Sequence, residues 1–495
     1  MTGRRCGQWL LLATWVLVGP PSGGRLAAVE GDGCDERDRS PYLQMLTTTG
    51  VLVVSRSAEP RAARLRLGLD PSLSLRLLES QVARRHVFRL EGLQPASDYF
   101  YEVEHVGLPP FPAARFRTLP EPGGEVRLAV IGDSGTLSDE QFAVARLLET
   151  LSPDLLLHTG DAAYPFGTPQ NYSEKFFDVY EGLLSRTCVY PALGNHDCFI
   201  TADFWLDAFY LPANNPDDDE SYYSFDAGDA HFAALNTCTW DLPPEQVEWL
   251  DEDLLRSRAT WNIVYFHHSI YSNAFHGGNL RVRDAVLWVL EKHGVDLVIC
   301  GHDHAYERSY PLRRGIPRGA FREPDYVDSG GTVYLVTGGG GAGLYPHIPS
   351  PDIHLSAVFH SVHHAVSLVI RPGEIVGEAI DIEGEVIDRF SIRKGGEAAQ
   401  PLYFVRGDAD GDGDALLTDA VVILSFLFTG GVPPCLAASD VNASGDIVIT
   451  DAIYLLNHLF TGGPPPPAPF PECGAVDGAD DGGCLASCAE EEVEV

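Results

Sequence analysis

The sequence predicts a multidomain protein with an N-terminal β-sandwich, a central layered α/β domain and a small all-α C-terminal module. Short β-rich runs separated by turns fill residues 38–119, and apolar runs alternate with helical patterns over residues 125–395. A duplicated acidic loop, each copy followed by an apolar helix, fills residues 402–475. A chain of 495 residues is also too long for one hydrophobic core.

Residues 1–28 are predicted to be a secretory signal. Arg4 and Arg5 precede an apolar stretch that is too short to span a bilayer, and small residues follow it. No later run reaches the ~18 apolar residues that a transmembrane helix needs. We therefore expect an exported protein without a membrane span, either secreted or located in the periplasm or at the cell surface.

The charge limits the possible partners, and the cysteines indicate which disulfides to expect. The net charge of −36 would repel nucleic acid, so no nucleic-acid partner is expected. Removing Cys6 with the signal leaves nine of the ten cysteines, an odd number in a compartment where disulfides persist. Cys300, inside an apolar strand, is the candidate free thiol, and a bridge among Cys188, Cys198 and Cys238 is expected to clamp the loop around Asn195.

The segment from 38 to 119 alternates short predicted strands with turns, at residues 51–56, 86–90, 99–106 and 114–118. Leu93, Pro95 and Tyr99 have the spacing of a tyrosine corner, so the segment resembles a fibronectin type III module, which is usually a spacer. A Pro/Gly-rich linker at residues 118–124 ends it.

In the central segment, five apolar runs end in residues that bind metals. Each run looks like a buried strand, and the ends of such strands meet at one edge of an α/β sheet. The polar residues at these ends are Asp133, Asp161 with Tyr164, Asn195 with His196, His267, and His302 with His304. Helices are predicted between them, one after the capping box of Ser138 and Gln141 and one after Asn279.

Seven of these residues form a donor set of nitrogen and oxygen atoms without cysteine. Such a set suits two intermediate or hard transition-metal ions. The seven predicted metal ligands are Asp133, Asp161, Tyr164, Asn195, His267, His302 and His304.

The order GD, GDxxY, GNH, VxxH and GHxH over residues 126–395 resembles the purple acid phosphatases, a branch of the calcineurin-like metallophosphoesterases. The resemblance implies a four-layer αββα sandwich in which Asp133, Asp161, Tyr164 and His304 hold one metal. Asp161 would bridge to the second metal, held also by Asn195, His267 and His302.

Tyr164 discriminates within that superfamily. A phenolate is a good ligand for Fe³⁺, whose charge lowers the phenol pKa. The resemblance implies Fe³⁺ beside Fe²⁺, Zn²⁺ or Mn²⁺, with a visible tyrosinate band. General metallophosphoesterases lack this Tyr and have a His near the first Asp, where this chain has Gly135.

The expected reaction is hydrolysis of a phosphate monoester by a metal-bound hydroxide. By the resemblance, His196 contacts phosphate oxygens and His276 assists the leaving group, although several plant-like members have paired His there and this chain has one. His267 rather than His268 is the ligand by the spacing from Val264, because neighbours on an extended strand face opposite ways. His158 and His231 are expected to be structural, and the Gly-rich stretch 338–346 is expected to be a flexible loop near the site.

The C-terminal segment carries two copies of a calcium-loop pattern, and Asp440 stands 32 positions after Asp408. Oxygen side chains at loop positions 1, 3, 5 and 12, with Gly at 6, are what Ca²⁺ requires. The predicted Ca²⁺ ligands are Asp408, Asp410, Asp412, Asp419, Asp440, Asn442, Ser444 and Asp451. Loop plus single helix, duplicated, resembles an EF-hand-like type I dockerin module, which implies a cohesin-like or cell-surface partner. The acidic tail 476–495 is expected to be disordered.

Two other functions fit parts of the sequence. A phosphodiesterase could use the same dinuclear centre, because the motifs fix the reaction centre and the pocket walls fix the substrate. A non-catalytic surface or binding protein would retain the flanking modules but lose metal ligands, and here all seven are present.

Overall fold

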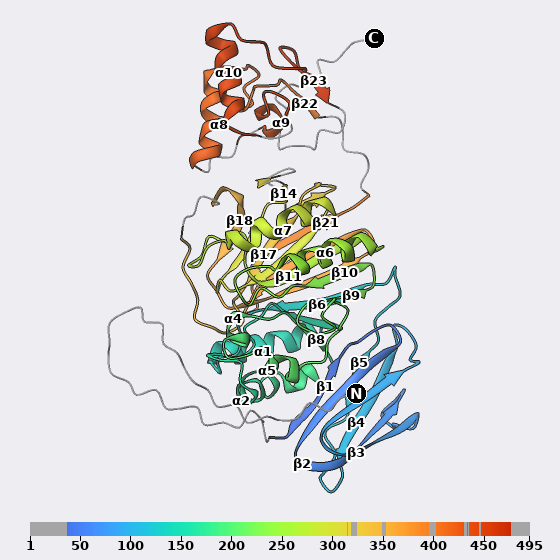
Figure 1. Ribbon diagram of the computed structural model, residues 1–495. Coiled ribbons are helices and arrows are strands. Elements are labelled where there is room, and N and C mark those ends of the chain that lie inside the picture. Colours follow the sequence, from blue (N-terminus) through green and yellow to red (C-terminus); the bar gives the residue numbers. More distant parts are fainter. Residues whose placement is uncertain are drawn as a thin grey trace, which may run out of the picture.

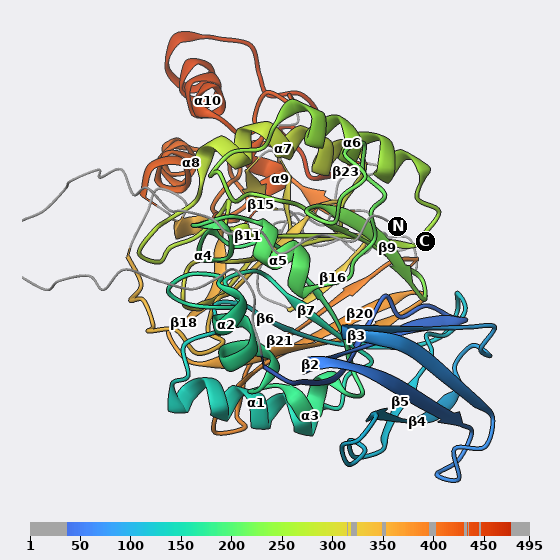
Figure 2. The ribbon, with the colours of Figure 1, turned by 60° about the horizontal axis from the view of Figure 1, so that its bottom comes forward.

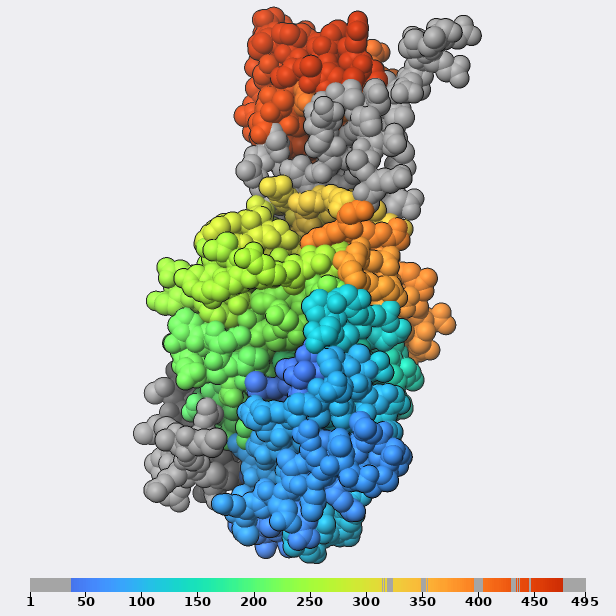
Figure 3. All heavy atoms as spheres, turned by 90° about the vertical axis from the view of Figure 1, so that its right-hand side faces the viewer, coloured from blue at the N-terminus to red at the C-terminus, as the bar shows by residue number. Residues whose placement is uncertain are grey.

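The fold was analysed in a computed structural model that describes residues 37–313, 315–317, 324–348, 353–395, 402–429, 433, 435–444 and 447–476. The predicted signal, 1–28, and nearly all of the predicted tail lie outside these residues. The N-terminal sheet (blue) and the C-terminal module (red) lie at opposite ends of the molecule, with the central domain between them (Figures 1 and 3).

The N-terminal region is one five-stranded sheet, in the order β1-β2-β4-β5 with β3 paired to β2. Its strands are β1 (Arg39–Gln44), β2 (Gly50–Gly68), β3 (Arg76–Glu91), β4 (Asp98–His105) and β5 (Ala114–Arg117). The sequence predicted a β-sandwich, but β2 runs on for 19 residues through register shifts between Arg56 and Ala63, so a single hydrogen-bonded sheet serves the whole region. The hydroxyl of Tyr99 accepts a hydrogen bond from the Gln94 amide at 2.8 Å, as the tyrosine-corner spacing predicts.

The central domain contains two seven-stranded sheets, shown in Figures 1 and 2. One has the order β16-β21-β20-β19-β6-β7-β8, and the other β18-β13-β17-β12-β11-β10-β9. The strands of the first are β6 (Val126–Ile131), β7 (Leu155–His158), β8 (Cys188–Pro191), β16 (Asp325–Val327), β19 (His364–Arg371), β20 (Glu374–Asp381) and β21 (Val386–Arg393). The strands of the second are β9 (Tyr223–Ala227), β10 (Ala230–Ala234), β11 (Trp261–His268), β12 (Leu297–Gly301), β13 (Tyr306–Ser309), β17 (Val333–Thr337) and β18 (Ser356–His360). A small ribbon pairs β14 (Leu312–Arg313) with β15 (Ile316–Pro317).

Helices cover the outer faces of the two sheets. One hydrophobic core joins both sheets to α1 and α3, and a second packs α6 and α7 on the β11–β12 sheet. The helical segments of this domain are α1 (Asp139–Leu151), α2 (Pro169–Tyr172), η1 (Ser173–Phe177), α3 (Glu181–Leu184), α4 (Asn195–Cys198), α5 (Asp203–Ala208), α6 (Pro244–Arg256), α7 (Leu280–Lys292) and η2 (Ile353–Leu355). The result is the helix–sheet–sheet–helix layering expected from the resemblance.

Both predicted helix starts are formed by their capping side chains. The Ser138 hydroxyl accepts a hydrogen bond from the Gln141 amide at 3.1 Å, and α1 follows. The Asn279 side chain accepts hydrogen bonds from the amides of Arg281 and Val282 at the start of α7. These caps satisfy amides that have no partner inside the helix.

The C-terminal module contains α8 (Leu417–Thr429), α9 (Leu436–Ser439) and α10 (Ile449–Thr461). A small core that includes Ile423, Phe426 and Leu455 packs α8 against α10. The all-α prediction was incomplete, because β22 (Leu402–Phe404) pairs with β23 (Gly474–Val476) and brings the two ends of the module together. Among the described residues, no helix has the length and apolar character needed to cross a bilayer.

Candidate metal centre

The candidate metal centre lies where strand ends of both central sheets meet. Asp133 and Asp161 follow the parallel strands β6 and β7, and Asn195 follows β8 at the start of α4. From the other sheet, His267 lies at the end of β11, and His302 and His304 follow the parallel strand β12. Residues separated by about 170 positions of sequence thus share one edge of the sandwich.

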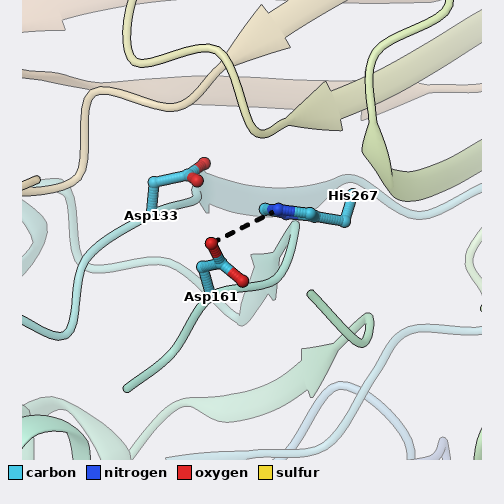
Figure 4. A group of neighbouring side chains, drawn as sticks. All are labelled: Asp133, Asp161 and His267. Atoms are coloured by element: carbon cyan, nitrogen blue, oxygen red, sulfur yellow. Dashed lines mark ion pairs between the residues drawn. The ribbon is translucent and has the colours of Figure 1, made fainter. Parts of the chain in front are cut away.

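Figure 4 shows Asp133, Asp161 and His267 pointing toward one another. A donor atom of each lies within 4.8 Å of the others, and His267 Nε2 is 3.4 Å from Asp161 Oδ2. The Asn195 side-chain oxygen is 3.0 Å from the same His267 nitrogen, and His302 Nδ1 is 3.3 Å from it. His267, Asn195 and His302 therefore converge on one side of Asp161.

On the other side, Tyr164 and His304 converge on Asp133. The Tyr164 hydroxyl lies 3.1 Å from Asp133 Oδ1 and 3.2 Å from His304 Nε2, and His304 Nε2 is 3.4 Å from Asp133 Oδ1. All seven predicted ligands thus lie together in two adjoining groups. Asp161 is central, because the phenol of Tyr164 also interacts with its carboxylate.

Three of these residues hold an unusual backbone conformation. The φ angles are 58° at Asp133, 58° at Asp161 and 69° at His302, the left-handed region that non-glycine residues seldom enter. Each such residue costs on the order of 1 kcal/mol or more, and such strain gathers at functional sites. The sharp turn aims each side chain out of its strand end and into the site.

Two glycines let the chain approach closely here. A Cβ atom on Gly194 would lie 2.1 Å from Asp161 Oδ1, and one on Gly135 would lie 2.0 Å from the Ala162 carbonyl oxygen. The position where general metallophosphoesterases have a His near the first Asp therefore has no room for a side chain.

The donor set fits bound cations. Asp133 and Asp161 are buried, and among the described residues neither carboxylate forms an ion pair with Lys or Arg. Burying carboxylates without a cation is costly, so the set requires positive charge. His302 Nε2 is also buried without a hydrogen-bond partner in the described structure. Oxygen and imidazole donors with one phenol match hard and intermediate transition ions.

The acid–base state of the site reflects this crowding of charges. Burial alone would lower the pKa of His267, but the Asp161 and Asp133 carboxylates outweigh it and raise that pKa to about 9. Burial and the same two carboxylates hold the pKa of Tyr164 well above its usual value. A bound cation would reverse the effect on the phenol, because it would stabilise the phenolate.

Backbone and carboxylate groups fix the orientation of the ligands. His267 Nδ1 lies 2.9 Å from the Thr159 carbonyl oxygen, and His304 Nδ1 lies 2.6 Å from the Gly343 carbonyl oxygen. The Asp197 carboxylate accepts hydrogen bonds from the amides of Asp161 at 2.8 Å and Gly194 at 3.0 Å. Such contacts set the tautomer and direction of metal-binding side chains.

The two histidines predicted to be catalytic lie at the edge of this group. His196 Nε2 is 3.9 Å from Asp161 Oδ2, its side chain is 33% exposed, and its ring packs on Tyr164. The His276 ring stacks on His302 with 4.2 Å between centroids, and its amide donates to Asp303 at 2.9 Å. Both imidazoles can therefore reach a group bound over the centre from outside.

The expectation that His267 and His268 face opposite ways was wrong in part. The pairing of β11 with β12 shifts register between Phe266 and His268, so two residues of β11 meet one of β12. As a result the His268 ring lies 4.5 Å from the His302 ring, and its Nδ1 contacts the Thr237 hydroxyl at 2.9 Å. His267 is still the one that contacts Asp161 and Asn195.

Sequence reasoning missed several residues around the centre. The Tyr345 ring stacks on His304 at 4.2 Å and an angle of 8° between the planes, and the Trp240 ring lies 4.8 Å from that of His302. Asp197 and Asp303 supply the carboxylates that hold the backbone of the ligand loops. Trp240 belongs to no motif, so only its position in space reveals it, whereas Tyr345 lies in the Gly-rich stretch 338–346 that was expected near the site.

The remaining predictions for this domain concern the loops and histidines around the centre. The Gly-rich stretch, expected to be flexible, is buried from Gly338 to Ala342 and bonded to the Asp133 turn, with the Ala342 amide 2.9 Å from the Asp133 carbonyl oxygen. His158 contacts the Ser134 hydroxyl, and His231 bridges Asp226 and Asp253, both structural arrangements.

The cysteines of this domain include the bridge that was expected near Asn195, although its partners could not be predicted. Cys198 and Cys238 form a disulfide, so the expected clamp is present beside Asn195. Cys300 is a free buried thiol as predicted, and so is Cys188.

The two C-terminal loops have equivalent geometry. In the first, Asp419 Oδ1 accepts from the Asp410 amide at 2.9 Å, and in the second Asp451 Oδ1 accepts from the Asn442 amide at 3.1 Å. Asp408 and Asp440 likewise accept from the amides of Asp412 and Ser444, four residues on. The carboxylates of Asp408, Asp410 and Asp412 come within 4.8 Å of one another.

Comparison with known proteins agrees with the fold and the motifs. The family model described as Calcineurin-like phosphoesterase matches residues 126–306. The chain is 31% identical to "Purple acid phosphatase 15" of Arabidopsis thaliana over 52% of its own length and 53% of that protein. It is 28% identical to "Acid phosphatase type 7" of Homo sapiens over 57% and 73% of the two chains. The chain thus spans about half the length of the plant relative.

A solved structure shows the same architecture. The purple acid phosphatase PPD1 isolated from yellow lupin seeds superposes with a TM-score of 0.63 at 21% identity, covering 72% of this chain and 75% of the lupin chain. The central domain therefore has the calcineurin-like metallophosphoesterase sandwich fold, with a β-rich region before it, and its homologues include purple acid phosphatases.

Proposed function

We propose that this protein is a secreted dinuclear-metal acid phosphatase that hydrolyses phosphate monoesters. The observation that carries the proposal is the convergence of seven donors, which include the phenol of Tyr164 and two buried carboxylates that have no Lys or Arg partner among the described residues. The phosphoesterase family match and the purple acid phosphatase relatives support the same reaction class.

Fe³⁺ and a divalent ion, Fe²⁺, Zn²⁺ or Mn²⁺, fit the two groups of donors. The group with Tyr164 suits Fe³⁺, because a phenolate prefers a highly charged ion. Asp133, Asp161, Tyr164 and His304 would hold this ion, and Asp161, Asn195, His267 and His302 would hold the divalent ion. Bound there, the pair would offset the charge of the ester and make water nucleophilic near neutral pH.

The side chains of the chain itself then position the substrate. His196 lies beside the bridging Asp161 with a third of its side chain exposed, so it can donate a hydrogen bond to a phosphate oxygen. His276 lies against His302 at the mouth of the centre, where it can give a proton to the departing alkoxide. Asp303, bonded to the His276 amide, holds that loop in place.

Metal analysis with a parallel assay tests the proposal. Two equivalents of transition metal beyond Ca²⁺, with 4-nitrophenyl phosphate cleaved faster than bis(4-nitrophenyl) phosphate at matched pH, are the expected result. Preference for the bis-ester would make the protein a phosphodiesterase. Absence of both metal and activity in protein reconstituted with iron and zinc would favour a non-catalytic binding protein.

Export is part of the proposal. The signal-like residues 1–28 support it, and so does the Cys198–Cys238 disulfide, since disulfides persist outside the reducing cytosol. Expression with the natural N-terminus in a secreting host should give protein in the medium whose first residue, by N-terminal sequencing, lies near position 28. Retention of Met1 on protein inside the cell would count against export.

We also propose that the C-terminal module binds two Ca²⁺ ions and docks on a cohesin-like or cell-surface partner. Residues at equivalent repeat positions expose apolar side chains in pairs, at Leu417 and Ile449, Val421 and Ile453, and Phe428 and Phe460. Exposed apolar side chains gathered on two packed helices are typical of an interface. The N-terminal sheet, with its tyrosine-corner contact, is proposed to be a spacer.

Calorimetric titration with a type I cohesin domain tests the docking. We expect Ca²⁺-dependent binding that Val421→Asp with Ile453→Asp weakens, because charges would be buried at the interface. The proposal would be contradicted if the double variant bound the cohesin domain as tightly as the parent does. It would also be contradicted if the parent bound equally well in Ca²⁺ and in EGTA.

A further inference from the structure

A cavity of about 320 Å³ opens beside the candidate metal centre. Five of the seven residues that line it are Trp240, His276, Leu280, Arg281 and His302, and the others are Gly277 and Asn279. His302 is a predicted metal ligand and His276 the predicted proton donor to the leaving group, so the cavity starts at the point where an alcohol would depart. The seven residues that line it include no carboxylate, although the whole chain has a net charge of −36.

The walls of this cavity are held in place by several contacts. The Trp240 ring packs against His268 at 4.3 Å and His302 at 4.8 Å, and 45% of the residue is exposed. The Asn279 side chain donates to the Trp240 carbonyl oxygen at 3.3 Å, which ties the Trp240 loop to the start of α7. The Cys198–Cys238 disulfide anchors the same loop two residues earlier.

Arg281 supplies the positive charge of the cavity. It stands in the first turn of α7, it is exposed, and within the described part of the chain its guanidinium has neither an ion pair nor a hydrogen bond. At a helix N-terminus, where the dipole already favours anions, a cation is not placed to stabilise the helix. An anion that entered the cavity would meet this unpaired charge.

We propose that this cavity, the Trp240–Arg281 pocket, binds the alcohol portion of the ester and selects substrates whose alcohol is a planar aromatic group with an anionic substituent. This inference rests on the proposed phosphatase function and adds its substrate class. Trp240 provides a face on which a ring can pack, and Arg281 provides the partner for a carboxylate or second phosphate on that ring. The phosphoryl group would at the same time reach His196 and the metal ligands.

The expected gains in affinity follow from the solvent exposure of the Trp240 and Arg281 side chains. Packing of one ring on a half-exposed Trp contributes about 1 kcal/mol, which is roughly a fivefold to tenfold difference in affinity. An ion pair with an exposed Arg contributes less, roughly twofold to fivefold. Selectivity should therefore depend more on Trp240 than on Arg281.

Three phosphonates separate these contributions in the full-length, metal-loaded protein. Methylphosphonate, benzylphosphonate and 4-carboxybenzylphosphonate share the anionic head, and none has a leaving group, so their inhibition constants and calorimetric Kd values report binding alone. We expect benzylphosphonate to bind about tenfold more tightly than methylphosphonate, and the carboxylate to add about threefold.

Substitutions assign each of the two gains in affinity to a residue. Trp240→Ala should abolish the preference for benzyl over methyl, and Arg281→Gln should abolish only the gain from the carboxylate. Trp288→Ala is the matched control, because Trp288 is also exposed on α7 but does not line the cavity. It should leave all three constants unchanged.

The outcomes distinguish this inference from the proposed function. Equal binding of methyl- and benzylphosphonate by the parent, or an unchanged ratio in Trp240→Ala, overturns the pocket while leaving the phosphatase intact. An equal loss for all three ligands in Trp240→Ala overturns it too, because Trp240 would then only support the metal loops. Failure of every phosphonate to bind the metal-loaded parent is a failure of the proposed function itself.

Discussion

Asp133, Asp161 and His302 hold the strained left-handed backbone of the centre, and each lies within three residues of the end of a buried strand. The strain persists because the surrounding hydrogen bonds determine the turn. The Asp161 amide donates to Asp197, and the His302 amide donates to Asp133 Oδ2 at 2.9 Å. The side chains are therefore directed toward the site before any ion arrives, which lowers the cost of binding one.

Tyr164 is the residue that would give the protein a colour. Tyr164→Phe removes the phenol oxygen that lies 3.1 Å from Asp133 and 3.2 Å from His304. We expect loss of the visible band and at least about tenfold weaker iron retention, since even residues that only orient a ligand cost that much. Absorption spectra and iron content of the purified variant measure both.

Tyr345→Phe is the matched control for this change. Tyr345 stacks on His304, but its hydroxyl makes no hydrogen bond among the described residues. The control should keep the band. A Tyr164→Phe protein with an unchanged spectrum would show that the phenol does not bind iron.

His231 makes stability depend on pH. Burial lowers its pKa, but hydrogen bonds to Asp226 and Asp253 outweigh burial and raise it to about 9. The folded state thus binds the proton more tightly than the unfolded state, and this stabilisation is complete below the unfolded value near 6.5 and lost as pH rises through about 9. His231→Gln should lower stability by about 2 kcal/mol at pH 6 and much less at pH 10.

Thermal unfolding from pH 6 to 10 measures this difference. His360→Gln, on strand β18 and without a described carboxylate contact, is the control for loss of an imidazole that has no charged partner. A His231→Gln deficit that does not shrink above pH 9 would show that the effect is packing and not charge.

At the scale of elements, the strand ends place the ligands and the disulfide fixes a loop. Cys198 ends α4, which begins with Asn195, and Cys238 precedes Trp240, so one bond ties a predicted metal ligand loop to the wall of the cavity. The bridge closes a separation of 40 residues.

Removing this bridge should be costly. Closing a loop of that size stabilises the folded state by about 4 kcal/mol in the chain-entropy account. Cys198→Ala with Cys238→Ala should therefore lower the Tm of the catalytic domain, measured by calorimetry. Reduction with a phosphine should lower the Tm of the parent to that of the double variant. It should leave the Tm of the double variant itself unchanged. Any other result would show that the loss of Tm does not come from the missing disulfide.

The elements themselves could largely be predicted from sequence. Caps at Ser138 and Asn279, and apolar runs that end in Asp, Asn or His, are local signals that survive folding. The bulge before His268 and the burial of the Gly338 loop could not be predicted, because both depend on which segment lies alongside. The same holds for Trp240 and Tyr345, whose neighbours are distant in sequence.

At the scale of the whole molecule, the C-terminal module has a small hydrophobic core of its own. Its first acidic loop gathers carboxylates that repel one another without an ion. We expect EGTA to lower the Tm of the module by ten degrees or more, since metal binding to such loops is coupled to folding. Calorimetry should show the same Tm for unfolding of the catalytic domain with and without EGTA.

Asp419→Ala with Asp451→Ala is the matching variant, because these residues stand at the last position of each loop. In Ca²⁺ it should resemble the parent in EGTA. If neither EGTA nor the double substitution changes the Tm of the module, the module folds without calcium.

The predicted ligands come from both central sheets, with Asp133, Asp161 and Asn195 on one and His267, His302 and His304 on the other. Ions bound there would stabilise the packing of the two sheets against each other, because the complete set of ligands exists only while the sheets are packed together. The rate of metal dissociation would then report how stably the two sheets pack together. A substitution in the apolar core between the sheets, far from any ligand, would be detected first as faster loss of metal.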